Sequence, residues 1–112
     1  MAEAGATSGA SADKARRRAA RELIAAYHQD QLRVLLEHVR DGFSRFDSGA
    51  IDEFELDDLI HRYKRAAREP WRFRGSTEGQ WLQAANSLTY LREQGEEPDW
   101  WARSAPRRDR PS

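Results

Sequence analysis

Apolar residues recur at helical spacing in two segments that flank the short polar stretch Ser48-Gly49. In the first segment, residues 13–46, they form a broad stripe along one side of a predicted helix: Ile24, Leu32, Leu35, Leu36, Val39, Phe43 and Phe46. In the second segment, residues 53–69, they share one narrower face: Leu56, Leu59, Ile60, Tyr63, Ala66 and Ala67. The pattern predicts a long antiparallel helical hairpin over residues 13–69.

Local signals mark the turn and the ends of the second helix. Gly49 tolerates the left-handed backbone that follows a helix. Asp52, with Glu55 three residues later, matches a capping box at the start of the next helix. We expect Pro70 to end that helix at residue 69, because proline disfavours helical backbone in the residue before it. Residues 70–75 are then predicted to be a linker.

A shorter third helix is predicted over residues 76–95. Thr77 and Gln80 have the spacing of a capping box, and Gly95 can end the helix. Residues 1–12 are small and polar, so they bury too little to offset the entropy of ordering, and we predict disorder there. Residues 96–112, rich in Arg and Pro towards the end, are predicted to be a mostly disordered tail. The expected fold class is therefore all-α.

Length and composition exclude several classes of protein. A chain of 112 residues forms one domain at most, and its formal net charge of zero does not suit a globally basic nucleic-acid binder. It contains no cysteine, so disulfides and thiolate metal sites are excluded. No apolar run approaches the ~20 residues that span a bilayer, and the first residues lack the apolar core of a signal peptide. We expect no membrane contact and a cytoplasmic location.

The sequence offers no recognisable catalytic, cofactor or metal site. Its histidines, His28, His38 and His61, do not have the spacing of a zinc site. Gly49, Ile51 and Glu55 match late positions of a calcium loop, but Phe46 stands where an early ligand is needed. Phosphate-binding and nucleophile motifs are missing as well. We therefore expect a protein that is not an enzyme and holds no cofactor.

Aromatic residues interleaved with arginines are the most unusual feature of the second half. Such residues suit a protein-binding surface, stacking on single-stranded nucleic acid, or a small core around the third helix. The sequence leaves these alternatives open. Two aliphatic residues of the long helix join the aromatic ones in the candidate partner-binding set, which is Leu35, Val39, Trp71, Phe73, Trp81, Trp100 and Trp101.

A local basic run near the start of the long helix carries the alternative function. It comprises Lys14, Arg16, Arg17, Arg18 and Arg21. One interpretation is a patch that contacts nucleic-acid phosphates. The other is a solvated helix end whose arginine stems cover apolar surface.

A longer run of residues resembles small hypothetical helical-hairpin proteins of high-GC bacteria, a family with no known activity. Those proteins often read Ala-Ala-(Lys/Arg)-Glu-Leu-Trp-Lys-Phe where this chain has Ala66-Ala-Arg-Glu-Pro70-Trp-Arg-Phe73. The resemblance starts at Tyr27-His28 and continues through Gly49, Ile51-Asp52 and Ile60-His61-Arg62-Tyr63 to Trp71. Pro70 departs from the family pattern. The resemblance implies a helical hairpin and transfers no site residue.

The relative lengths of the two arms suggest a function. A second helix of about 17 residues cannot cover a first helix of about 33, because each residue adds only ~1.5 Å. The third helix or a second copy of the chain must then cover the remaining apolar turns, and we favour the second copy slightly. The sequence thus predicts a non-enzymatic interaction or regulatory protein that works as a homo-oligomer or bound to a protein partner.

Overall fold

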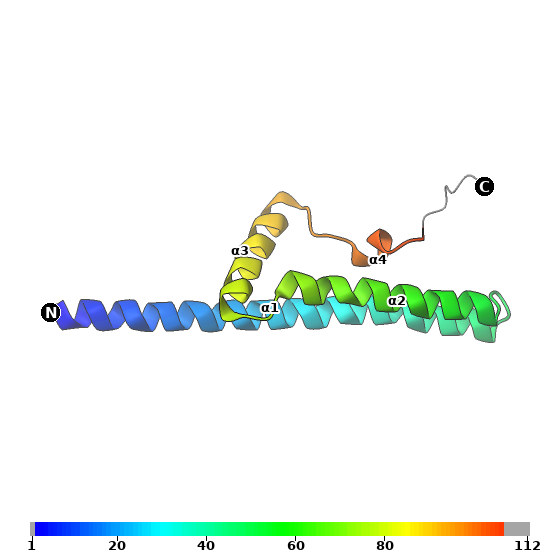
Figure 1. Cartoon of the computed structure of the whole chain (residues 1–112), viewed down its shortest axis with the longest axis horizontal. Coiled ribbons are helices and arrows are strands. Elements are labelled where there is room, and N and C mark those ends of the chain that lie inside the picture. Colours follow the sequence, from blue (N-terminus) through cyan, green and yellow to red (C-terminus); the bar gives the residue numbers. More distant parts are fainter. Residues whose placement is uncertain (1, 107–112) are drawn as a thin grey trace. The chain divides into compact units, whose positions relative to one another are not determined.

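A computed structural model describes residues 2–106 and shows helices joined by short connections (Figure 1). Within these described residues four helices follow one another: α1 (Ala2–Asp47), α2 (Glu53–Arg74), α3 (Glu78–Gln94) and α4 (Trp100–Arg103). No strand occurs among the described residues. The prediction of an all-α fold is confirmed.

The chain divides into two compact units, and α1 contributes to both. Unit 1 combines the part of α1 up to Tyr27 with Arg74–Glu97, which contains α3. Unit 2 combines His28–Phe73 with the segment that begins at Pro98, and so contains the second part of α1, all but the last residue of α2, and α4.

Helix α1 is longer than predicted. It begins at Ala2, so the structure has helix where we predicted disorder over residues 1–12; Met1 lies outside the described residues. Extending an existing helix adds a hydrogen bond for each residue without a new nucleus, and alanine is frequent in this part of the chain. Residues 9–19 are all exposed, so tertiary packing contributes little to this extension.

The connection between α1 and α2 follows the predicted signals. Gly49 adopts a φ of 81°, which residues other than glycine rarely adopt. Asp52 accepts a hydrogen bond from the Glu55 amide at 2.8 Å, and Glu55 accepts one from the Asp52 amide at 3.0 Å. These reciprocal bonds form the expected capping box and start α2 at Glu53.

Helix α2 continues through Pro70 to Arg74, so the predictions of a helix end at residue 69 and a linker over 70–75 are wrong. Proline removes one hydrogen bond of the helix, and its ring approaches the carbonyl four residues earlier. That residue is Ala66, and both Pro70 and Ala66 are fully buried. The burial of the proline ring offsets the lost bond. The helix ends only at Gly75, whose φ is 75°.

Helix α3 is bounded as its sequence signals suggest, within two residues at the start. Thr77 accepts a hydrogen bond from the Gln80 amide, and the Gln80 side chain accepts one from the Thr77 amide. At the other end, Gly95 is left-handed and the Glu96 amide donates to the Leu91 carbonyl at 2.8 Å. The predicted helix over 76–95 is thus observed as Glu78–Gln94.

The segment predicted to be a disordered tail, residues 96–112, contains α4. Asp99 caps this short helix by accepting from the Ala102 amide at 3.0 Å. Trp100 is buried in the core of unit 2 together with Leu35 and Ala66. Burial of a large aromatic residue provides the stabilisation that the local sequence lacks. Residues 107–112 lie outside the described part of the chain.

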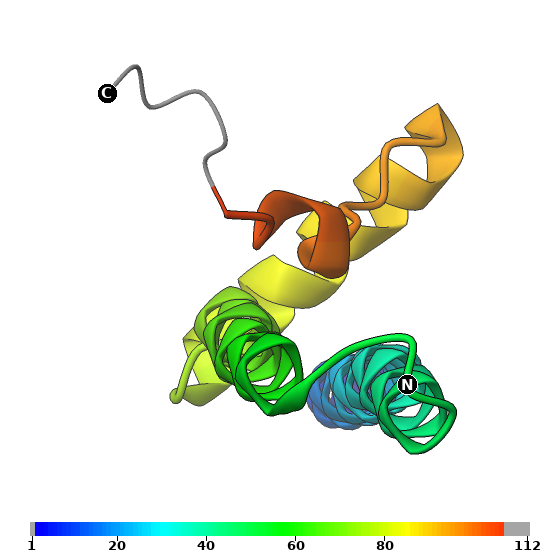
Figure 2. The same cartoon turned by 90° about the vertical axis from the view of Figure 1, so that its right-hand side faces the viewer.

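Within unit 2, α2 lies alongside the second part of α1, and α4 lies on one side of this pair (Figure 2). Gly42 of α1 marks the close approach of the two longer helices. A Cβ atom at this position would lie 2.8 Å from Cδ1 of Leu59 in α2. A larger residue at position 42 would therefore force the Leu59 side chain to move.

Candidate interaction surfaces

Helix α4 is attached to unit 2 by an aromatic contact and a set of hydrogen bonds. The ring of Trp101 stacks on His38 of α1, with the planes 4° apart and the centroids separated by 4.3 Å. The guanidinium of Arg62 in α2 lies 4.0 Å from the Trp101 ring. Trp101 therefore contacts both longer helices of the unit.

Arg62 also holds the backbone that follows α4. Its Nη2 donates to the Trp101 carbonyl at 2.6 Å, and its Nε donates to Ser104 Oγ at 3.2 Å. Burial lowers the pKa of Arg62 below its ordinary value, and the positive charge of Arg65 lowers it further. These contacts make Arg62 the main polar anchor of α4.

A pocket of about 270 Å³ lies beside this anchor. Its lining mixes charges of both signs: His38, Asp41, Arg45, Glu55, Asp58, Leu59, Arg62, Trp101 and Pro106. Several of these charges are engaged locally, because Arg45 pairs with Asp41 at 4.0 Å and Glu55 caps α2. No group of residues suited to holding a metal ion occurs in the described chain. The pocket shows no arrangement that points to a particular ligand.

The opposite side of the two-helix layer carries apolar side chains that remain accessible. Leu36 and Phe43 of α1 are 49% and 47% exposed, and Trp71 of α2 is 56% exposed. Half-buried apolar residues complete this side. We call it the open face, and it consists of Leu32, Leu36, Val39, Phe43, Ile60, Ala67 and Trp71.

The helix geometry shows why α4 does not cover the open face. His38, which contacts α4, lies ~200° around α1 from Leu36, since each residue turns the helix by ~100°. On α2, the α4 contact Arg62 is displaced by a similar angle from Ile60. The contacts of α4 thus lie on one side of the layer, where Figure 2 shows α4, and the open face lies on the other side by helix geometry.

The structure does not bring the predicted partner-binding residues onto one surface. Leu35 and Trp100 are 1% and 7% exposed, so both belong to the core and cannot contact a partner directly. Phe73 and Trp101 pack against this core. Trp81 is partly buried in unit 1, where its Nε1 donates to the Gly75 carbonyl.

Only Val39 and Trp71 of the predicted set belong to the open face. The Trp71 ring meets His28 edge to face, with centroids 4.2 Å apart. His28, whose role the sequence left undefined, is 4% exposed.

Sequence reasoning did not separate the open face from the core. A signal was present, because Leu32, Leu36, Val39, Phe43 and Phe46 alternate at spacings of four and three residues. This is the spacing of a helix seam that packs against another helix. The predicted broad stripe contains both that seam and Leu35, whereas Leu35 lies about 100° away from Leu36 around the helix.

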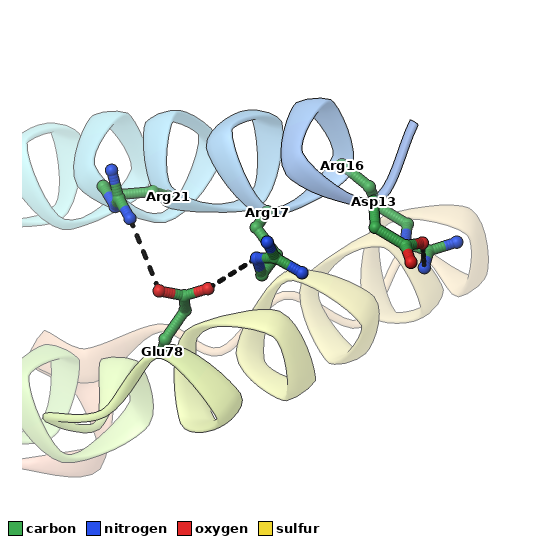
Figure 3. A network of polar contacts seen from close by, with 5 residues as sticks. All are labelled: Asp13, Arg16, Arg17, Arg21 and Glu78. Carbon is green, nitrogen blue, oxygen red and sulfur yellow. Dashed lines mark hydrogen bonds and ion pairs between the residues drawn. The ribbon is translucent and has the colours of Figure 1, made fainter. Parts of the chain in front are cut away.

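The basic run lies in unit 1, on the exposed part of α1, and most of it is engaged in ion pairs (Figure 3). Glu78 of α3 accepts from Arg17 Nε at 2.7 Å and lies 3.6 Å from Arg21 Nη2. Arg16 pairs with Asp13 at 2.5 Å. Within the described residues, Lys14 and Arg18 have no ion pair, so the run carries fewer available charges than its sequence suggests.

Comparison with other proteins supplies no identity for the chain. No protein-family model matches it, and no curated protein or solved structure matches it either. Among the described residues, no helix combines the length and the apolar character that a membrane crossing requires.

Proposed function

We propose that this protein is a non-enzymatic interaction or regulatory module that works as a homo-oligomer or bound to a protein partner through its open face. The frame of this module is the antiparallel helical hairpin predicted from the sequence. The cytoplasmic location and the resemblance to helical-hairpin proteins of high-GC bacteria stay predictions of the sequence.

One observation carries the proposal: the open face is apolar and accessible, although the chain has an element that covers the other side of the same layer. Leu36 and Phe43 are a heptad apart on one helix, and each leaves about half of its surface accessible. Large exposed apolar residues that line up along an element mark interaction sites more often than scattered ones do.

The basic run supports the alternative, a nucleic-acid-associated protein, less well. Binding to phosphates requires protein cations that are free to neutralise them and so displace the counterions condensed on the nucleic acid. Arg16, Arg17 and Arg21 already have carboxylate partners. Among the described residues, no contact favours the alternative over the interaction module.

A pair of variants tests the proposed function. Leu36→Asp places a charge on the open face, whereas Val34→Asp places the same charge on the far side of α1. The two positions are equally accessible, at 49% and 51%, so the variants match in helix, exposure and introduced group. We expect light scattering and binding assays to show that Leu36→Asp abolishes association while Val34→Asp retains it.

Leu35→Asp would not serve as this test, because Leu35 lies in the core and the variant would unfold unit 2. Circular dichroism must therefore show the same helical signal for Leu36→Asp, Val34→Asp and the wild type. If the wild type associates and both variants associate equally well, the open face is not the interaction surface. If the wild type neither self-associates nor retains a protein partner, the proposed function is wrong.

A further inference from the structure

We propose that the occupant of the open face is a second copy of this chain, packed antiparallel to the first so that Arg33 of each copy pairs with Asp47 of the other. This inference rests on the proposed function and adds the identity and the orientation of the partner. It follows from the distribution of charge along the edge of the apolar seam.

Three exposed charged residues follow the solvent side of the seam on α1: Arg33, Arg40 and Asp47. They are seven residues apart, so they lie on one side of the helix. Arg40 follows Leu36 and Asp47 follows Phe43 by four residues, which places this charged row beside the seam. Arg40 pairs with Glu37 at 3.2 Å within the same helix. In the described part of the chain, neither Arg33 nor Asp47 has an ion-pair partner.

The charges at the two ends of the seam are opposite, and this asymmetry selects the orientation. In a parallel pair of copies, the Arg33–Asp47 edges of the two seams would lie on opposite flanks of the interface, so Arg33 of one copy could not reach Asp47 of the other. In an antiparallel pair centred near Arg40, each Arg33 faces the Asp47 of the other copy. Only the antiparallel arrangement brings these opposite charges together across the interface, so it is favoured.

The position of Asp47 at the end of α1 strengthens this argument. The carbonyl groups at a helix C-terminus carry partial negative charge, which disfavours a carboxylate there. A cation from the second copy would relieve that repulsion. Near the symmetry axis, Arg40 of one copy would approach Arg40 of the other. The ion pair of each Arg40 with Glu37 of its own helix compensates these two positive charges.

The same arrangement matches the apolar residues of the seam. With a two-fold axis near Arg40, Leu36 of one copy lies near Phe43 of the other copy. Two Leu36–Phe43 neighbourhoods then form by symmetry, with the Val39 side chains between them. Each copy covers the half-exposed surface that the other leaves accessible.

A charge swap tests the pairing. Arg33→Glu and Asp47→Arg each place like charges together in the antiparallel pair, and the double variant restores opposite charges. We expect each single variant to raise the dimer Kd by about tenfold at low salt and the double variant to return it close to the wild-type value. All of these positions are exposed, so the variants should retain the helical signal of the wild type.

Disulfide capture tests the orientation separately, because the chain contains no cysteine of its own. Leu36→Cys and Phe43→Cys are mixed, one of them carrying a size tag, and are then oxidised. The antiparallel pair should give mainly mixed Leu36→Cys/Phe43→Cys disulfides, whereas a parallel pair would give mainly like-with-like products.

The outcomes separate this inference from the proposed function. If the wild type is a dimer but the double charge variant is no tighter than the single ones, or if like-with-like disulfides dominate, the antiparallel inference is overturned and the interaction module stands. If the wild type stays monomeric at millimolar concentration yet binds another protein through Leu36, the second copy is excluded while the proposed function holds.

Discussion

Two adjacent leucines on α1 provide the sharpest test of how the side chains are distributed between core and surface. Leu35 is 1% exposed and packs in the cluster that contains Ala66 and Trp100, whereas Leu36 is 49% exposed. Leu35→Ala removes fully buried methyl groups and leaves a cavity. Buried Leu→Ala changes cost about 2–5 kcal/mol, and we expect about 3 kcal/mol here. Leu36→Ala removes methyl groups that are already half exposed to water, so it should lower the free energy of unfolding by less than ~1 kcal/mol.

The assay is equilibrium unfolding in urea at a protein concentration low enough to keep the chain monomeric. With a slope of ~2 kcal/mol per molar urea, Leu35→Ala should lower the midpoint by about 1.5 M. Leu36→Ala should lower it by less than ~0.5 M. At high concentration, the wild-type midpoint should rise because association stabilises the folded state, and Leu36→Ala should reduce that rise. Equal losses for both variants at low concentration would show that the two side chains are not distributed as described.

Three further predictions concern the remaining contacts. Arg62→Met removes the anchor of α4, so tryptophan emission should shift to longer wavelength with little loss of helical signal. Lys64→Met on the same helix should change neither signal, and unchanged emission in Arg62→Met would contradict the anchoring role. Thr77→Ala removes the cap of α3 and should lower the free energy of unfolding by about 1 kcal/mol in urea titrations. The neighbouring Ser76→Ala should have little effect, and equal losses of unfolding free energy in the two variants would contradict the capping role. Gel shifts with single- and double-stranded DNA and RNA at low salt should show no retarded band, because most arginines of the basic run are already paired with carboxylates. A band that weakens steeply with salt would instead support the nucleic-acid alternative.

Local sequence signals predicted the element boundaries that depend on local interactions. Asp52 with Glu55 and Thr77 with Gln80 form the capping boxes that their spacing indicated. Gly95 adopts the left-handed backbone expected of a helix end. In each case the interacting groups lie within a few residues of one another, so the sequence contains all the information that determines the boundary.

Boundaries that depend on distant residues were not predictable in this way. Pro70 is tolerated inside α2 because its ring is fully buried, and burial depends on which segments pack around it. Helix α4 has too few residues to show a periodic pattern. Trp100 is held by a core that also contains Leu35 and Ala66, far away in sequence. The sequence showed that these tryptophans are costly to expose, but it could not show which surface would cover them.

The candidate site was only partly predictable for a related reason. A broad apolar stripe shows that a helix has more than one neighbour, but it does not assign each residue to a neighbour. Leu35 and Leu36 belong to the same stripe, and their separation by ~100° becomes meaningful only when α2 and α4 are placed. Val39 lies on the open face, and its contact with a partner stays a prediction.

In unit 2, the contacts that hold α4 lie on one side of the α1–α2 layer, and the open face lies on the other side. Trp101, His38 and Arg62 hold α4 on one side, and their contacts do not include Leu36 or Phe43 on the other. Energetic effects at sites without shared partners are usually additive. Release of α4 should therefore weaken unit 2 without altering the open face, and a charge on the open face should leave α4 attached. This independence separates the internal role of the aromatic residues from the proposed association through the apolar seam of α1.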